Sequence, residues 1–356
     1  MHMADALLSP AVSAAMTVVS VGALGYSAVM LKKEEERGVP LGADDRKVPV
    51  MGVMGAFVFA AQMINFTIPA TGSSGHIGGG ILLAAMLGPH AAFLTLAAVL
   101  VIQCLFFADG GLMALGCNIF NMGFYACFAA YPLIFKPIMK LGLGAKNITA
   151  ASVASVVAGL QLGAFSVVLE TLASGVTELP FGTFLLLMMP IHLAIGAIEG
   201  VITAGVLCFV MNMRPELLDF SAPGGFGPRK AALSFGRTLM VLLTMAALIG
   251  GGLSLYASAY PDGLEWSIEK TAPSSELERT GGAYDTAAKI QESTAIMPDY
   301  EFKSAAGGDT GSSFAAAGTS AAGLAGGTMT LVLACAVGWI ITMFRKNKRE
   351  KDNAAA

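Results

Sequence analysis

The chain has 356 residues, of which 55% are hydrophobic and only 13% are charged, and its mean hydropathy is +0.69. Soluble domains carry roughly 25% charged residues, so this composition excludes an ordinary soluble protein and indicates an all-α polytopic membrane protein in contact with the lipid bilayer. The formal net charge of −3 gives no reason to expect a nucleic acid partner.

The first two residues, Met1 and His2, form a potential metal chelator. The α-amino nitrogen, the His2 amide nitrogen and His2 Nδ1 can close two fused chelate rings around one ion and leave a fourth planar position open. The amide must lose its proton, and Met1 must stay attached, deformylated and uncapped. Ni²⁺ and Cu²⁺ promote this deprotonation best and suit planar nitrogen ligands. The alternative is that His2 has no special role.

The first predicted span covers residues 6–31. No Lys or Arg precedes it, whereas Lys32 and Lys33 follow it, which is the reverse of the charge pattern of a cleavable signal peptide. This pattern favours an uncleaved span with its N-terminus outside. A second span is predicted over residues 48–68.

A Gly/Ser-rich external loop follows the second span and contains His76. Its glycines, at positions 72, 75 and 78–80, would let the backbone fold back into the membrane, where irregular backbone survives only if protein surrounds it. Such a re-entrant loop would bring His76 Nε2 to the open fourth position beside Met1 and His2. Four planar nitrogens favour square-planar Ni²⁺ or Cu²⁺ over tetrahedral Zn²⁺. A solvated loop histidine is the alternative.

The apolar run over residues 79–108 contains Gly88-Pro89, where a helix should break. It is therefore either one kinked span or two short ones. Two spans, with a turn at Gly88-Pro89-His90 inside, place three lysines in the cytoplasm, where Lys and Arg concentrate: Lys136, Lys140 and Lys146. We therefore predict two spans.

Further spans are predicted over residues 113–135, 148–172, 181–211, 238–256 and 323–344, which gives nine spans. Of the 21 Lys and Arg residues, this topology leaves four outside: Lys270, Arg279, Lys289 and Lys303. Met1-His2 and His76 then share the external side, and the C-terminus lies in the cytoplasm.

The spans and charges predict two membrane units. Residues 1–211 form a seven-span body, 212–237 a cytoplasmic linker, 238–344 a two-span unit and 345–356 a basic cytoplasmic tail. An external segment, 257–322, lies between the last two spans. It begins with the turn residues Pro261-Asp262-Gly263 and ends in a low-complexity stretch, 307–323, that we expect to be flexible.

Other polar residues in or near the spans offer further candidates. His90, at the predicted inner turn, is interpreted as structural. His192 lies within a span, where a histidine is a functional candidate, in a supporting role to the metal ligands. The sequence Gly72-Ser73-Ser74-Gly75 also allows a rhomboid-like intramembrane serine protease with Ser74 and His192. Asp109-Gly110-Gly111, with Gln103 and Asn118 nearby, forms either a cavity wall or an ordinary turn.

Three stretches resemble the CbiM/NikM family of substrate-specific components of energy-coupling factor (ECF) transporters: MHMADALLSP, INFTIPATGSSGHIGGG and MLGPHAAFLTLAAVLVIQCLFFADGGLMALGCNIFNMG. The later stretch YPDGLEWSIEK, with IMPDYEF and a last span, is similar to the small NikN/CbiN-type partner of the PDGLE class, fused to the body. The resemblance covers nearly the whole chain. Met3 and Asp5 stand where many members have Ile and Glu.

The resemblance implies a seven-helix body in a prokaryotic cell membrane that takes up Ni²⁺ or Co²⁺ without being an enzyme. It implies that the metal is held by the Met1 amine, the His2 amide and imidazole, and His76. It also implies a transmembrane coupling subunit and two cytoplasmic ATPases as partners, and no organic cofactor. The chain itself contains no Walker A loop. A membrane scaffold without transport activity is the remaining alternative.

Overall fold

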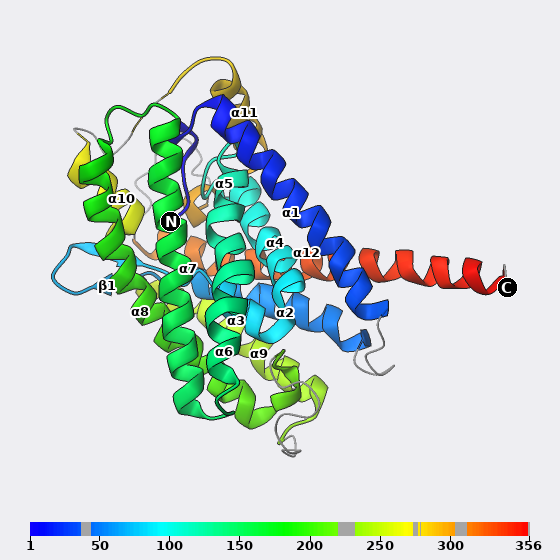
Figure 1. The fold of residues 1–356 in the computed structure, drawn as a ribbon. Coiled ribbons are helices and arrows are strands. Elements are labelled where there is room, and N and C mark those ends of the chain that lie inside the picture. Colours follow the sequence, from blue (N-terminus) through cyan, green and yellow to red (C-terminus); the bar gives the residue numbers. More distant parts are fainter. Residues whose placement is uncertain (37–43, 220–231, 273–276, 278, 303–311, 355–356) are drawn as a thin grey trace.

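The computed structural model describes residues 1–36, 44–219, 232–272, 277, 279–302 and 312–354, and most of these residues are helical (Figure 1). The helices of at least 17 residues are α1 (Pro10–Glu36), α2 (Asp44–Gln62), α4 (Pro89–Phe107), α7 (Ala145–Ala173), α8 (Phe181–Met213), α9 (Phe235–Gly251) and α12 (Ser312–Ala354). One further helix, Leu115–Met139, runs without a break from α5 (Leu115–Ile119) through the π-helical η2 (Phe120–Phe135) to α6 (Lys136–Met139).

The shorter elements lie between these helices and at the N-terminus. They are η1 (Asp5–Leu7), the strands β1 (Phe66–Ile68) and β2 (Ser73–Gly75), α3 (Gly80–Leu87), η3 (Pro215–Leu217), η4 (Leu253–Tyr256), α10 (Gly263–Thr271), α11 (Ala283–Thr294) and η5 (Pro298–Tyr300).

Six described helices are long and apolar enough to cross a membrane, namely α1, α4, the helix Leu115–Met139, α7, α8 and α12. A membrane-spanning helix satisfies all its backbone hydrogen bonds internally, which is why these apolar runs fold as helices. The prediction of a multi-pass, all-helical membrane protein is confirmed. The predicted count of nine spans differs from this number, since α9 is shorter, α2 begins with charged residues and α3 has only 8 residues.

The predicted break at Gly88-Pro89 is confirmed. Helix α3 ends at Leu87, Gly88 has φ of +80°, and Pro89 begins α4. Asp219 lies against this turn: its amide donates to the carbonyl of Ala85, and its carboxylate is 2.9 Å from Lys136 Nζ. The turn therefore lies at the same end of the bundle as Lys136, as the charge argument required. We call this the Lys136 end.

The second predicted span was too long at its C-terminal side. Helix α2 ends at Gln62, and residues 66–68 instead pair as β1 with β2 in an antiparallel ribbon, with Thr67 opposite Ser74. After β2 the chain enters the bundle, where the glycines allow close contact. A methyl group on Gly79 would lie 2.5 Å from Val58, and one on Gly80 would lie 2.5 Å from Ala126. This entry explains why α3 is short.

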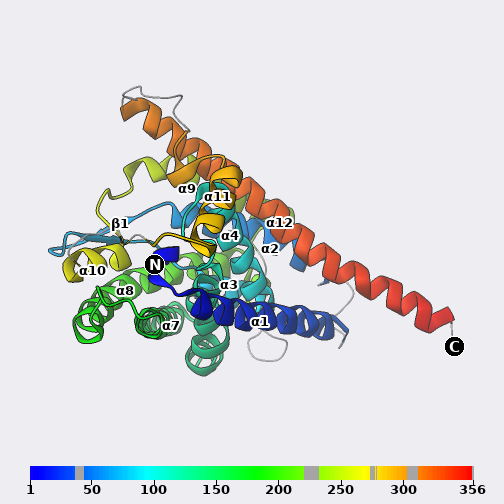
Figure 2. The ribbon, with the colours of Figure 1, turned by 90° about the horizontal axis from the view of Figure 1, so that it is seen from above.

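The bundle has two sides when it is seen along α7. Helices α7 and α8 pack together on one side, and α12 lies along the other side, against α2, α9 and α4 (Figure 2). Helix α12 crosses the body at a steep angle (Figure 1). Small residues allow its close approach, since a methyl group on Gly326 would lie 2.0 Å from the ring of Phe59.

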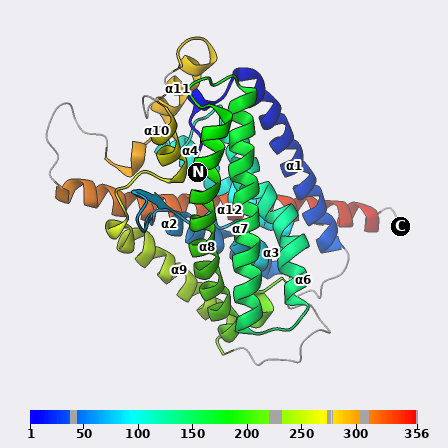
Figure 3. The same ribbon diagram turned by 60° about the vertical axis from the view of Figure 1, so that its left-hand side comes forward.

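The segment between α9 and α12 folds back over the body. Helices α10 and α11 lie at the end of the bundle where α1 begins, which we call the N-terminal end, whereas α6 lies at the other end (Figure 3). The Tyr284 hydroxyl donates to the carbonyl of Leu8, and the amide of Ile296 donates to that of Phe106. This segment is therefore part of the packed structure around the N-terminus.

The predicted low-complexity stretch and the predicted linker are only partly described by the structure. The stretch 307–323 was expected to be flexible, but Ser312 begins α12, as the Ala-rich sequence favours a helix; residues 307–311 lie outside the described residues. Much of the predicted linker 212–237 also lies outside them, namely 220–231, while α9 already begins at Phe235.

Candidate metal site

The N-terminal residues are held in a fixed, buried position. Asn118 makes two hydrogen bonds with the backbone of Met3: its Oδ1 accepts from the Met3 amide at 2.8 Å, and its Nδ2 donates to the Met3 carbonyl at 3.2 Å. Gly111 donates its amide to the same carbonyl. Asp5 Oδ1 accepts from the Ala114 amide at 3.0 Å. As a result Met1 is only 6% exposed.

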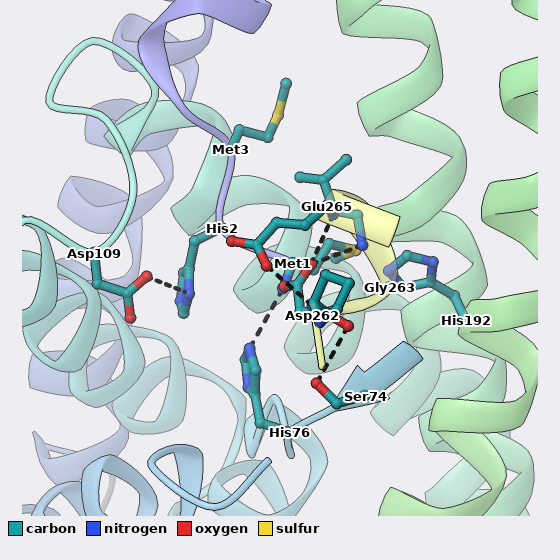
Figure 4. Close-up of polar contacts among 12 residues, drawn as sticks. Met1, His2, Met3, Ser74, His76, Asp109, His192, Asp262, Gly263 and Glu265 are labelled. Carbon is teal, nitrogen blue, oxygen red and sulfur yellow. Dashed lines mark hydrogen bonds and ion pairs between the residues drawn. The ribbon is translucent and has the colours of Figure 1, made fainter. Parts of the chain in front are cut away.

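The Met1 ammonium lies between a carboxylate and an imidazole (Figure 4). Its nitrogen is 2.5 Å from Asp262 Oδ2 and 3.3 Å from His76 Nε2. Burial alone would raise the pKa of Asp262, but the ammonium outweighs burial and holds that pKa well below its usual range. A proton thus lies between two nitrogens that are both possible metal ligands.

His76 presents the correct nitrogen to this position. Its Nδ1 lies 3.0 Å from the carbonyl oxygen of Ile77. A carbonyl can only accept, so Nδ1 carries the proton and Nε2 directs its lone pair at the Met1 nitrogen. Burial, together with the Met1 ammonium and His2, lowers the pKa of His76 to about 3. The imidazole is therefore neutral at pH 7, as a metal ligand must be.

His2 lies beside His76 but faces a different partner. The two imidazole rings stack with centroids 5.3 Å apart and an interplanar angle of 11°. His2 Nδ1 lies 3.0 Å from Asp109 Oδ1, while Tyr300 donates its hydroxyl to the other carboxylate oxygen. His2 Nε2 is buried and has no hydrogen-bond partner among the described residues. The structure thus brings Met1, His2 and His76 together, with His2 Nδ1 in contact with Asp109.

Two carboxylates of this site were not predicted as functional residues. Asp109 was considered only as part of a turn or a cavity wall, and Asp262 as a turn residue. Burial would raise the pKa of Asp109, but His2 and Tyr300 hold it well below its usual range. Asp262 and Glu265 form a capping box on α10, which fixes the Asp262 carboxylate. The Asp-x-x-Glu spacing was a usable signal for that helix start.

Two cavities meet at these residues. One, of about 40 Å³, extends into the bundle and is lined by Met1, His76, Asp262 and Glu199, among others. The other, of about 990 Å³, is bordered by His2, His76, Asp262 and Tyr300, among others. In the described part of the chain, no three His, Cys, Asp or Glu side chains gather as a metal-binding cluster.

The other candidate residues have different partners. Ser74 donates its hydroxyl to the Tyr260 carbonyl at 2.7 Å, and His192 Nδ1 lies 2.8 Å from the Met188 carbonyl. No hydrogen bond joins Ser74 to His192 in the described structure, so this geometry does not favour the protease alternative. His90 lies at the Lys136 end, with Nε2 3.8 Å from Glu34 and its ring against Phe128.

Comparisons with known proteins agree with this architecture. Residues 2–217 match the family model of CbiM, described as the cobalt uptake substrate-specific transmembrane region, and residues 236–343 match that of the PDGLE domain. A putative fused nickel transport protein NikMN of Archaeoglobus fulgidus is 30% identical over 74% of this chain and 84% of its own length. The cobalt transport protein CbiM of Geobacter sulfurreducens is 32% identical over 63% of this chain and 65% of its own length.

A solved structure gives the same result. A crystal structure of a transition metal transporter is similar with a TM-score of 0.50 and 31% identity, over 59% of this chain and 92% of that one. The predicted resemblance is therefore confirmed: the chain belongs to the CbiM family of transmembrane proteins and carries a PDGLE domain after the CbiM region.

Proposed function

We propose that this chain is the metal-capturing membrane subunit of an ECF-type uptake system for Ni²⁺ or Co²⁺. The observation that carries the proposal is the 3.3 Å contact between the Met1 nitrogen and His76 Nε2, with the lone pair of Nε2 facing Met1. The names of the relatives, which concern nickel transport in one case and cobalt transport in the other, support the choice of cargo.

The proposed ligands are the Met1 amine, the His2 amide, His2 Nδ1 and His76 Nε2. To bind the ion, the ammonium and the amide each lose a proton, and the His2 ring turns away from Asp109. Before binding, the Met1 ammonium carries a charge of about +1. After binding, the divalent ion, the neutral amine and the negatively charged amide together carry the same net charge. Capture therefore keeps the local charge constant, and the partly buried Asp262 carboxylate remains compensated.

We also propose the domain organisation and orientation given by the charge pattern. The body (1–211) and the two-span unit (238–344) are joined by a cytoplasmic linker (212–237), and the basic tail 345–356 lies in the cytoplasm. Met1, the His76 loop and the segment 257–322 lie outside. The shared position of α10, α11 and the start of α1 at one end of the bundle supports this orientation.

The remaining steps require other polypeptides. A transmembrane coupling subunit and cytoplasmic ATPases would supply ATP-driven reorientation, since the chain has no phosphate-binding loop of its own. The segment 257–322 would regulate loading, because its Asp262 contacts the Met1 nitrogen to which the ion must bind. Unchanged uptake after deletion of 257–322 would dismiss this regulatory role.

Calorimetric binding of Ni²⁺ and Co²⁺ to the purified full chain tests the ligand set. Mass spectrometry first establishes that the mature protein begins with a free Met1 amine. We expect one ion per chain, and loss of this ion both in a form extended by two residues before Met1 and in His76→Ala. Equal binding by all three forms would refute the proposed ligands.

A further inference from the structure

One buried carboxylate contacts the metal-binding loop but has no place in the proposed ligand set. Glu199 lies inside α8 and is 3% exposed. An ionisable side chain inside a membrane span is costly and is usually kept for a function. Glu199 lines the cavity of about 40 Å³ that also contains Met1 and His76.

Glu199 accepts a hydrogen bond from the backbone three residues after His76. Its Oε1 lies 3.0 Å from the Gly79 amide nitrogen. This amide directly precedes α3, where the first N–H groups of a helix have no partner within the helix. In this buried position Glu199 supplies the acceptor that the Gly79 amide would otherwise lack.

A second side chain holds the same peptide segment from α2. Gln62 Nε2 donates to the Gly78 carbonyl at 3.0 Å, and Gln103 Nε2 donates to Gln62 Oε1 at 2.8 Å. Gly79 has φ of +77° and no room for a side chain beside Val58. The glycines let the loop enter the bundle but give it no side chains with which to hold its shape, so buried partners must hold it.

The orientation of His76 depends on this backbone. His76 Nδ1 contacts the carbonyl of the next residue, Ile77. Because this carbonyl belongs to the same loop, the contact does not fix the His76 ring relative to the rest of the protein. We propose that Glu199 is a positioning residue, which holds the Gly78–Gly79 backbone so that His76 Nε2 stays directed at the Met1 nitrogen. This inference rests on the proposed function of the site.

The alternative is that Glu199 acts on the ion through its charge, because it lines the same cavity. Glu199→Gln separates the two roles, since glutamine keeps an acceptor oxygen but loses the charge. Glu199→Ala removes both. Glu170→Gln is the matched control: Glu170 is a buried carboxylate on the neighbouring α7, and its described partner is Asn121 Nδ2, at 2.8 Å, not the His76 loop.

The first measurement is hydrogen–deuterium exchange of metal-free protein, on peptides that contain residues 76–80. We expect exchange at the Gly79 amide to rise by at least about tenfold in Glu199→Ala, because the acceptor that protects it is gone. Glu199→Gln and Glu170→Gln should remain close to wild type. Unchanged protection in Glu199→Ala would overturn the proposal.

The second measurement is calorimetric Ni²⁺ binding by the same four proteins. Glu199→Ala should lose at least about tenfold in affinity, and Glu199→Gln should stay within about threefold of wild type. Equal losses in both variants would overturn positioning in favour of charge, and wild-type affinity in Glu199→Ala would overturn either role. Should Glu199→Ala fail to fold, Gln62→Leu removes the hydrogen bond to the Gly78 carbonyl, which belongs to the same peptide group as the Gly79 amide. This variant must then raise exchange at the Gly79 amide.

The two measurements also distinguish this inference from the proposed function. If wild-type protein binds no Ni²⁺ or Co²⁺, the proposed ligand set fails, whereas the exchange experiment still decides whether Glu199 holds the loop. If wild-type protein binds and Glu199→Ala shows neither effect, the ligand set stands and the positioning role is wrong.

Discussion

The two ends of the bundle carry similar side chains in different arrangements. At the N-terminal end, Asp262 pairs with the Met1 ammonium, and their side chains are 16% and 4% exposed. At the Lys136 end, Asp219 pairs with Lys136, and these side chains are 28% and 40% exposed. In the first pair the ammonium is buried beside an imidazole whose Nε2 lone pair faces it, whereas the second pair is a more exposed contact at a helix turn.

Each end also has a tyrosine–aspartate pair and a histidine. Tyr300 donates to Asp109, which holds His2, and Tyr131 donates to Asp219 at 2.7 Å. His90 lies among rings and near Glu34. The two ends therefore differ less in residue types than in the exposure of the side chains and the direction of the nitrogen lone pairs.

The largest expected difference in Ni²⁺ affinity is between substitutions of His76 and His90. His76→Ala removes a proposed metal ligand and should weaken Ni²⁺ binding by at least about a hundredfold. His90→Ala should leave the affinity unchanged within about twofold, because His90 lies at the opposite end. Calorimetry on both variants checks this. Equal effects of the two substitutions would remove the distinction between the ends.

Acid should weaken metal binding strongly at the N-terminal end. The ammonium of Met1 and the amide of His2 must each lose a proton, so affinity should fall by about tenfold to a hundredfold per pH unit. His76 adds no further proton, since its pKa is lowered to about 3. Calorimetry in buffers of different ionisation enthalpy measures the protons released. Release of no protons would contradict the amine and amide as ligands.

The window from pH 7.5 to 6.5 avoids the loss of stability expected from protonation of His76. The pKa of His76 is lower in the folded protein than its ordinary value of 6.5. Its contribution to stability is therefore complete above pH 6.5 and is lost as the pH falls from there towards 3. Thermal unfolding of the metal-free protein at each pH serves as the control.

The two ion pairs should differ in their contribution to stability. Asp262→Asn leaves a buried ammonium without its counter-charge and should lower the unfolding free energy of the metal-free protein by about 2 kcal/mol. Asp219→Asn breaks a more exposed pair and should cost less than about 1 kcal/mol. Denaturant titration of both variants in detergent compares them. A larger loss in Asp219→Asn would reverse our assignment.

The tyrosines should give the smallest difference. Tyr300→Phe removes the donor that fixes Asp109 and should change the Ni²⁺ affinity by about threefold, through the orientation of His2. Tyr131→Phe removes the equivalent donor to Asp219 and should leave the affinity unchanged. The same calorimetric assay compares them, and identical values would show that Tyr300 does not act on His2.

Much of the fold could be predicted because membrane spans follow from hydropathy and charge. The break at Gly88 followed from the proline after it. The glycine-rich loop allowed the contact between Met1 and His76, with a solvated loop histidine as the alternative. The lengths of α2 and α3 could not be predicted, because they depend on how deeply the His76 loop enters, and packing around Val58 and Ala126 decides that.

The carboxylates of the site were missed for a related reason. Asp262 lies 261 residues after Met1 in the chain, and no local sequence pattern predicts a contact over that separation. Asp is a common turn residue, and only the contacts of Asp109 with His2 and Tyr300 distinguish this segment from an ordinary turn. Glu199 lies in an apolar span, and its partner is the backbone amide of Gly79. No side chain in the sequence indicates that contact.

X-ray absorption spectroscopy of the Ni²⁺-loaded full chain tests the central claim most directly. We predict a square-planar ion with four nitrogen ligands, including two imidazole nitrogens and a deprotonated amide. A six-coordinate ion bound mainly by oxygen, for example by the carboxylates of Asp109 and Asp262, would contradict the proposed site.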